Sequence, residues 1–300
     1  MRIAVTGLTG QVVLSLVERG PFAGHEIIPV GRPGLDLAAG DRAAVHAALA
    51  SVRPDAIVSA AAYTAVDKAE AEPDLAFVVN AEGAGHVAAA ATALGVPLVH
   101  LSTDYVFAGG GSRAWTEDDP AFPQGIYGAS KLAGEKSVLT ACADAAVLRT
   151  AWVFSPFGAN FVTTMLRLAS ARDEVGVVAD QTGNPTSALD LADGILAVAA
   201  NLAASSDPAL RGVFHMSGAG ETHWAGFAEA IFAESAACGG PAARVKAITT
   251  AEYPTPAARP ANSRLDCSRL AAVHKVRLPA WQGSLAQVID RLIAQGKGTQ

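Results

Sequence analysis

The sequence contains few cysteines, and they are not arranged for a disulfide framework or a metal site. Cys142, Cys238 and Cys267 are odd in number and far apart, and no pair has the spacing of metal ligands. Buried, reduced thiols are therefore expected, which is typical of proteins in a reducing compartment. We expect a cytoplasmic protein.

Long apolar runs and basic stretches are also missing. The alanine-rich segments 86–101 and 194–204 are either interrupted by Gly95 and Pro97 or too short to cross a bilayer. Lysine and arginine number 22 against 28 acidic residues, which gives a net charge of −6 without a basic stripe. Nucleic acids and anionic membranes attract such stripes, so we expect neither as a partner.

What the sequence does contain is enough apolar chain for a large core. Of its 300 residues, 51% are hydrophobic and 17% charged, as in a folded globular protein. The patterns predict strands at 3–7, 26–31, 56–60, 98–102 and 145–150, and helices at 11–19, 41–52, 73–94 and 127–142. This alternation predicts an α/β fold with a Rossmann-type, doubly wound parallel sheet.

The regularity loosens beyond Thr150. We expect a dinucleotide-binding domain from residues 1–150, to which about 175–205 return by adding a strand and a helix. Residues of about 151–174 and 206–300 then form a smaller, less regular substrate-binding domain. The segment 239–262 is rich in proline and is predicted to be mainly loop.

Tyr127 and Lys131 form the most informative pair in the chain. Their spacing of four residues places both side chains on one face of a helix. An ammonium group near a phenol favours the phenolate, so we expect the pKa of Tyr127 to fall below the free value of about 10. The Thr103 hydroxyl, which follows the strand 98–102, completes a trio suited to proton transfer at a carbonyl. The pair alone also arises by chance on solvated helix faces.

A glycine turn near the N-terminus suits a dinucleotide. Gly7 permits a tight turn after the first strand, and Gly10 lets the backbone approach a pyrophosphate at the N-terminus of the next helix. The third position of the usual pattern is Val13, which puts very close packing of helix on strand in doubt. A plain turn with two glycines is the alternative, although the context favours the nucleotide site.

Other strand ends carry further candidates, each with a structural alternative. Arg32 follows the second strand, where an arginine suits a 2′-phosphate, but a surface arginine is about as plausible. Small side chains in 60–64 suit either a cofactor or a well-packed strand end. Thr103 and Asp104 end the fourth strand, where open α/β sheets bind ligands, and Trp152 follows the fifth. Asp104 also fits a cap, and Trp152 a core residue.

Together these motifs resemble the extended short-chain dehydrogenase/reductase family, over nearly the whole chain. The matching stretches are 5–12, 60–70, 102–107, 127–135, 149–154, 160–167, Asp180-Gln-Thr-Gly-Asn-Pro-Thr186 and Arg259-Pro-Ala-Asn-Ser-Arg-Leu265. The last two are not general to Rossmann enzymes. Within the family they resemble the dTDP-4-dehydrorhamnose reductases.

The resemblance implies reduction of the 4-keto group of dTDP-4-dehydro-L-rhamnose to dTDP-L-rhamnose, with NADPH or NADH. It implies that Tyr127 donates the proton, that Lys131 binds the nicotinamide ribose, and that Thr103 hydrogen-bonds the reacting oxygen. The other cofactor-binding residues that it implies are Gly7, Gly10, Gln11, Val12, Asp36, Leu37, Ala61, Ala62, Tyr63 and Thr64. It places Thr103, Asp104 and Trp152 against the sugar, and we expect Arg259, Asn262 and Ser263 to hold the nucleotide diphosphate.

The resemblance leaves several points open. Some family members carry acidic residues for a magnesium ion at a subunit contact, but Ser15 stands where a first-helix glutamate would be, so we expect no metal. A homodimer is one option for the oligomeric state. Another nucleotide-sugar 4-ketoreductase or an epimerase would use the same trio. A cofactor-bound regulatory subunit, like that of methionine adenosyltransferase, also resembles this family, but intact Thr103, Tyr127 and Lys131 favour catalysis.

Overall fold

The computed structural model describes residues 1–297, with side chains through Gln295. Its strands are β1 (Arg2–Thr6), β2 (Glu26–Val30), β3 (Ala56–Ser59), β4 (Leu98–Thr103), β5 (Ala145–Thr150), β6 (Val153–Phe154), β7 (Glu174–Val178), β8 (Thr182–Gly183), β9 (Thr186–Ser187), β10 (Gly212–His215), β11 (Thr222–His223) and β12 (Arg244–Ile248). Its α-helices are α1 (Gln11–Arg19), α2 (Arg42–Ser51), α3 (Val66–Ala69), α4 (Pro73–Phe77), α5 (Ala84–Leu94), α6 (Ile126–Ala141), α7 (Phe161–Ala169), α8 (Ala188–Ala204), α9 (Trp224–Ala237), α10 (Ser268–Val273) and α11 (Trp281–Lys297).

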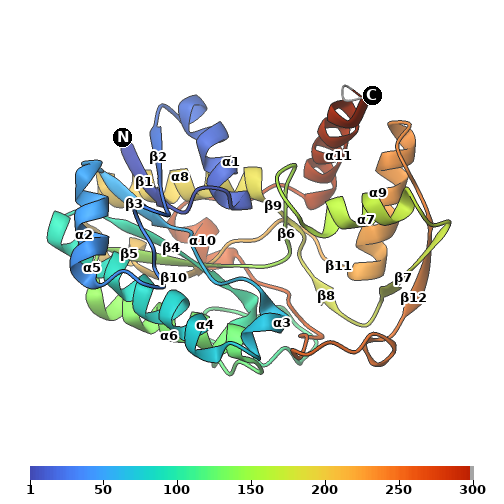
Figure 1. The fold of residues 1–300 in the computed structure, drawn as a ribbon, viewed down its shortest axis with the longest axis horizontal. Coiled ribbons are helices and arrows are strands. Elements are labelled where there is room, and N and C mark those ends of the chain that lie inside the picture. The colour runs from blue at the N-terminus through green and yellow to red at the C-terminus, as the bar shows by residue number, and fades with distance from the viewer. Residues whose placement is uncertain (298–300) are drawn as a thin grey trace.

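Six strands form one parallel sheet in the order β10-β5-β4-β3-β1-β2. The chain starts at β1 and winds outward on both sides of it, so the strand order reverses between β1 and β3 (Figure 1). In doubly wound sheets the crevice at this reversal is the usual ligand site. The predicted Rossmann-type sheet is therefore confirmed.

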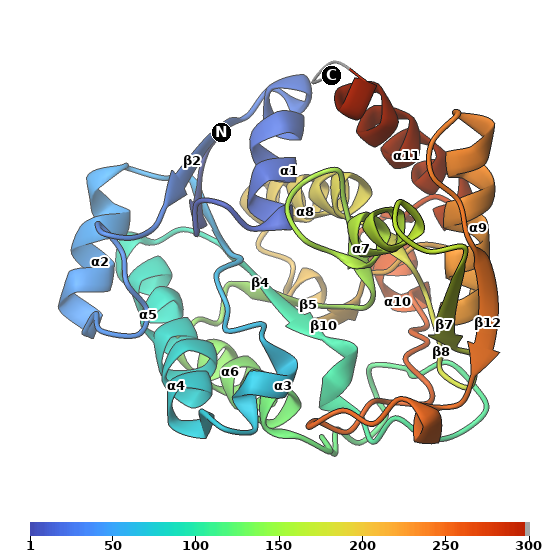
Figure 2. The same ribbon diagram turned by 45° about the vertical axis from the view of Figure 1, so that its right-hand side comes forward.

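Helices cover both faces of this sheet (Figure 2). On one face, α1 and α8 bury Val13, Leu16 and Ile195 against the strands. On the other face, α2, α5 and α6 form a second apolar cluster, which includes Leu49 and Val138. Every residue of β4 and β5 is buried, because strands covered by helices on both faces have no solvated side. Within the described residues, no helix is long and apolar enough to cross a membrane.

The later part of the chain builds a second core beside the sheet. Helices α7, α9 and α11 pack with β7 around Phe154, Phe227 and Ile289 (Figure 1). The predicted helix near 188–203 is α8, which packs on the sheet as expected. The predicted strand near 175–179 is β7, but it does not return to the sheet, because it pairs with β12 instead.

Two strands, β10 and β12, were not predicted from the sequence. β10 lies in the segment assigned to the substrate-binding part, yet it pairs with β5 as the edge strand of the main sheet. β12 lies inside the segment 239–262 that was predicted to be mainly loop, because the flanking prolines hide a short, largely exposed strand. The division into two functional domains stays a prediction.

A buried ion pair ties α6 to the sheet. Arg149 on β5 donates from Nε and Nη2 to the two carboxylate oxygens of Glu135 on α6, at 2.8 and 2.7 Å. Ser102 on β4 donates to the same carboxylate at 2.5 Å, and the Phe107 ring lies 4.9 Å from the guanidinium carbon. Both charged side chains are almost fully buried. The pair thus holds α6 at the carboxyl ends of β4 and β5.

Removing one member of this pair should be costly. Glu135→Ala leaves a guanidinium buried without its counter-charge, so we expect the free energy of unfolding to fall by about 3–5 kcal/mol. Urea denaturation measures it. As a control, Glu26→Ala removes the partner of Arg2 in an exposed pair and should cost about 1 kcal/mol or less. Equal losses in the two variants would contradict the structural role of the buried pair.

Candidate active site

The glycine turn lies at the reversal of strand order. Gly7 has a φ of +103°, where a side chain would be strained, and a Cβ there would lie 3.3 Å from Val13 Cγ2. Gly10 is the N-cap of α1, so the first N–H groups of that helix open toward the turn. Val13 is buried and fills the space beside Gly7, so the close packing that was in doubt is present.

The neighbouring strand end is fixed by backbone contacts. The Thr6 hydroxyl accepts hydrogen bonds from the N–H groups of Ala60 and Ala61, at 3.0 and 2.9 Å. Asn80 accepts from the N–H of Tyr63 at 2.8 Å, and its amide donates to the Tyr63 carbonyl and to the Ser130 hydroxyl. The 60–64 segment is therefore held against both β1 and α6.

Asn80 also holds this part of the site, although nothing in the sequence predicts it as a site residue. It is buried within a π-helical turn, Val78–Gly83, that interrupts the helix predicted over 73–94. Such turns are rare and often occur at functional sites. Its partner Ser130 in turn donates to the carbonyl of Tyr127 at 2.8 Å, so Asn80 links the 60–64 segment to α6. An asparagine inside a helical pattern gives no sequence signal of this role.

Helix α6 packs unusually close to its neighbours. A Cβ on Gly128 would lie 2.1 Å from the Tyr105 carbonyl oxygen, and one on Gly134 would lie 2.0 Å from that of Asn80. Both distances are too short for any side chain, so these two glycines allow the approach. The approach brings Tyr127 and Lys131, which are on α6, to the end of β4.

Tyr127, Thr103 and Asp104 form a connected group. Thr103 Oγ1 donates to Asp104 Oδ1 at 3.0 Å, and the Tyr127 phenol lines the same cavity as both residues. Burial raises the pKa of Tyr127, the Asp104 carboxylate raises it further, and the Thr103 hydroxyl opposes the rise. The expected lowering by Lys131 is therefore wrong for this structure, because burial dominates. Burial also raises the pKa of Asp104 to about 6.

Lys131 is buried beneath this group. Its ammonium donates to the Leu101 carbonyl at 2.6 Å, and burial lowers its pKa to about 8. Tyr105 packs edge-on against the Tyr127 ring, with centroids 5.5 Å apart. The catalytic trio predicted from the sequence is thus brought together at the end of β4.

These groups line a cavity of about 560 Å³ that begins at the glycine turn. Of the predicted cofactor residues, the cavity wall includes Gly10, Gln11, Val12, Ala62, Thr64, Tyr127 and Lys131. Gly7, Arg32, Asp36, Leu37, Ala61 and Tyr63 lie outside that wall. Leu37 is a core residue, while Asp36 accepts from the Ala38 N–H and Arg32 is exposed at the end of β2.

The predicted substrate residues divide between two cavities. Thr103, Asp104 and Trp152 line the first cavity, whereas Arg259 lines an adjoining one of about 620 Å³. Tyr105 lines both and stands between them. Arg259 donates to Asp67 at 2.6 Å, and its Nη1 atom is buried without a partner.

Asn262 and Ser263 have other contacts than those expected. Asn262 is buried, and its amide donates to the carbonyls of Gly110 and Arg113, so its side chain holds a loop. Ser263 is buried, and its N–H donates to the Thr182 carbonyl at 2.8 Å. Neither Asn262 nor Ser263 lines either of these two cavities. Their contacts with loops do not favour direct contact with a diphosphate.

Comparisons with known proteins place these features in one family. The family described as the RmlD substrate binding domain matches residues 1–294. The dTDP-4-dehydrorhamnose reductase of Sinorhizobium fredii is 48% identical over 298 residues, which cover 99% of each chain. That of Burkholderia thailandensis is 42% identical over 301 residues, 98% of this chain and 100% of the relative.

Solved structures agree with the sequence relatives. A dTDP-4-dehydrorhamnose reductase of Clostridium acetobutylicum matches with a TM-score of 0.89 at 36% identity, covering 97% of this chain and 99% of that one. One from Bacillus anthracis, in complex with NADP, matches with a TM-score of 0.88 at 36% identity and the same coverage. Because these likenesses span almost the whole length, the chain belongs to the RmlD family, an oxidoreductase family whose relatives named here are dTDP-4-dehydrorhamnose reductases.

Proposed function

We propose that this chain reduces the 4-keto group of dTDP-4-dehydro-L-rhamnose to give dTDP-L-rhamnose, with NADPH as reductant, in rhamnose biosynthesis. The observation that carries the proposal is the convergence of Thr103, Tyr127 and Lys131 on one cavity that begins at the glycine turn. The named function of relatives that match 98–99% of this chain supports the same substrate.

The residues of the first cavity fit a dinucleotide. Gly7 and Gly10 carry no side chains at two positions of the turn before α1, where helix N–H groups favour a pyrophosphate. Ala60 and Ala62 add a wall of small side chains. When bound, NADPH supplies the hydride. Lys131 lines the same cavity, and its ammonium would hold the nicotinamide ribose.

The trio then supplies the proton. Reduction of a ketone adds a hydride to carbon and a proton to oxygen, so the acid must carry its proton at neutral pH. The raised pKa of Tyr127 keeps the phenol protonated, which suits a donor in a reductase. Thr103 then hydrogen-bonds the same ketone oxygen, because it lines the same cavity as Tyr127. Trp152 and the Asp104 carboxylate form the sugar side of the cavity.

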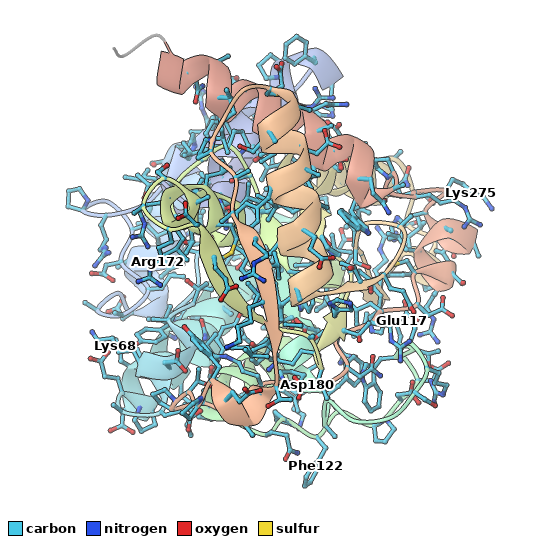
Figure 3. The ribbon with its side chains drawn as sticks, turned by 90° about the vertical axis from the view of Figure 1, so that its right-hand side faces the viewer. Lys68, Glu117, Phe122, Arg172, Asp180 and Lys275 are labelled. Atoms are coloured by element: carbon cyan, nitrogen blue, oxygen red, sulfur yellow. The ribbon has the colours of Figure 1, made fainter. Side chains whose placement is uncertain are left out.

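The second cavity fits the nucleotide diphosphate of the substrate. Arg167, Arg172 and Arg259 line it, and Arg172, which is labelled in Figure 3, lies just before β7. Within the described residues, neither Arg167 nor Arg172 has an ion pair. Two phosphate groups would pair with these guanidinium groups, which bind phosphate oxygens well. The substrate would thus reach from Tyr127 past Tyr105 into this cavity.

The competing functions make different demands on the site. A regulatory subunit needs the cofactor cavity but no acid, so the assembled trio favours catalysis. An epimerase returns its hydride to the sugar and consumes no coenzyme. Coenzyme oxidation should be followed with dTDP-4-dehydro-L-rhamnose, with UDP- and GDP-keto-sugars beside it. Oxidation with the dTDP sugar alone supports the proposal, and oxidation with none of them contradicts it.

We also retain two broader proposals. Within the described residues, none of the three cysteines forms a disulfide, which is consistent with a cytoplasmic location. Val17 on α1 and Phe22 just beyond it are exposed, and they give a homodimer an apolar contact. Light scattering coupled to gel filtration measures the mass in solution, and a mass of about 30 kDa would contradict the homodimer.

Tyr127→Phe tests the proton donor. The variant keeps the aromatic ring but lacks the acid, so we expect kcat to fall by about 10²–10⁴-fold while NADPH affinity is kept. Steady-state kinetics and a coenzyme titration measure both. Tyr253 lines the second cavity and not the first, so Tyr253→Phe should keep kcat near the wild-type value at saturating substrate and serves as the control for kcat. A Tyr127→Phe rate above half of the wild-type rate would remove Tyr127 from this role.

Arg32→Ala tests coenzyme choice. If Arg32 meets the 2′-phosphate, its loss removes a charge-assisted contact of about 1.5–3 kcal/mol, so KM for NADPH should rise at least about tenfold. KM for NADH should stay the same, because NADH lacks that phosphate. Arg42→Ala, at the start of α2, is the matched control. Equal changes for both coenzymes would make Arg32 an ordinary surface residue.

Arg259→Ala tests the nucleotide end of the substrate. We expect the dissociation constant of dTDP to rise about tenfold or more, since a phosphate contact is lost, while that of NADPH stays unchanged. Calorimetry measures both constants. Arg244→Ala removes an exposed arginine outside both cavities and should change neither. Unchanged dTDP affinity in Arg259→Ala would contradict the assignment, and weakened NADPH binding would place Arg259 at the other cavity.

A further inference from the structure

Trp152 has a backbone conformation that tryptophan rarely adopts. Its φ is +49°, in the left-handed region that favours glycine, so the surrounding structure must hold it there. The backbone is fixed on its C-terminal side, because Val153 on β6 pairs with Thr186 on β9 and the Thr186 N–H donates to the Trp152 carbonyl at 3.1 Å. In this conformation Trp152 lines the first cavity, the one that also contains Thr103 and Tyr127.

A second tryptophan lies directly against this indole. The rings of Trp152 and Trp224 are stacked, with centroids 3.6 Å apart and an interplanar angle of 11°. The Phe161 ring packs against Trp224, with ring centroids 4.5 Å apart. Trp224 and Phe161 line the second cavity, whereas Trp152 lines the first, so one aromatic wall runs past both.

Gly183 makes room for the same indole. A Cβ on Gly183 would lie 2.5 Å from Cε2 of Trp152, which is too close for any side chain. Gly183 is on β8, which pairs with β11, and Trp224 follows β11 as the first residue of α9. The pairing of β8 with β11 therefore brings Gly183, which has no side chain, close to Trp224, which stacks on Trp152.

We propose that Trp224 is a positioning residue that, with Gly183, holds the Trp152 indole as a fixed wall of the sugar site. The proposal rests on the proposed function only in assigning the wall to a sugar. It gives the motif Asp180–Thr186 a role that the catalytic trio does not explain. An indole held by a stack before substrate arrives need not be ordered on binding, which favours productive orientation of the ketone.

Trp224→Leu removes the stacking surface and keeps an apolar side chain. An aromatic pair of this kind stabilises its geometry enough that we expect KM for the keto-sugar to rise about three- to tenfold, with the affinities for NADPH and for dTDP unchanged. Trp224→Phe keeps a ring and should restore most of the wild-type KM. Trp281→Phe is the matched control, because Trp281 is buried in the same core but lines neither cavity.

A spectroscopic readout separates positioning from activity. Two stacked indoles give an exciton couplet in far-ultraviolet circular dichroism, which the wild type and Trp281→Phe should show. Gly183→Ala keeps both tryptophans but displaces Trp152, so the couplet should shrink and KM should rise together. The proposal is overturned if Trp224→Leu keeps the wild-type KM, if Trp281→Phe raises KM equally, or if the wild type shows no couplet. Failure of the wild type to reduce any keto-sugar would overturn the proposed function instead, while the couplet still tests the geometry.

Discussion

The close docking of α6 against the carboxyl end of β4 is the constraint on which the site depends. Gly128 and Gly134 permit the approach, since side chains at either position would collide with neighbouring carbonyl oxygens. The buried Glu135–Arg149 pair and the Asn80–Ser130 hydrogen bond then fix the helix from two sides. With the helix fixed, Tyr127 is held in the same cavity as Thr103. Catalytic geometry and stability are therefore built from the same contacts.

The substrate side is organised by a different principle. Here the two C-terminal motifs contact each other, because the Thr182 N–H donates to the Ala261 carbonyl and Asn184 accepts from the N–H of Leu265. These contacts place Arg259 at the second cavity and keep Gly183 under Trp152. β8 and β11 contain only two residues each. The hydrogen bonds between the 180–186 and 259–265 segments therefore also stabilise this region.

Much of this could be predicted from the sequence, for physical reasons. Five of the six main-sheet strands, β1 to β5, are short apolar runs, so their positions were predicted within about one residue, whereas β10 was missed. The pairing of Tyr127 with Lys131 follows from helix periodicity alone. Tertiary effects were not visible: the direction of the Tyr127 pKa shift depends on burial, and the stacking of Trp152 on Trp224 joins residues 72 apart in the chain. Asn262 was assigned to the ligand because nothing in the sequence shows that its amide holds a loop.

In the proposed reaction, NADPH bound in this site delivers a hydride to the 4-keto carbon of a dTDP sugar while Tyr127 supplies the proton. The most direct measurement is isotopic: NADPH deuterated at the transferable position is incubated with the wild-type protein and dTDP-4-dehydro-L-rhamnose, and the product is analysed by NMR. The account predicts dTDP-L-rhamnose with one deuterium at C4 and none elsewhere on the sugar. Unlabelled product, or deuterium at another carbon, would contradict it.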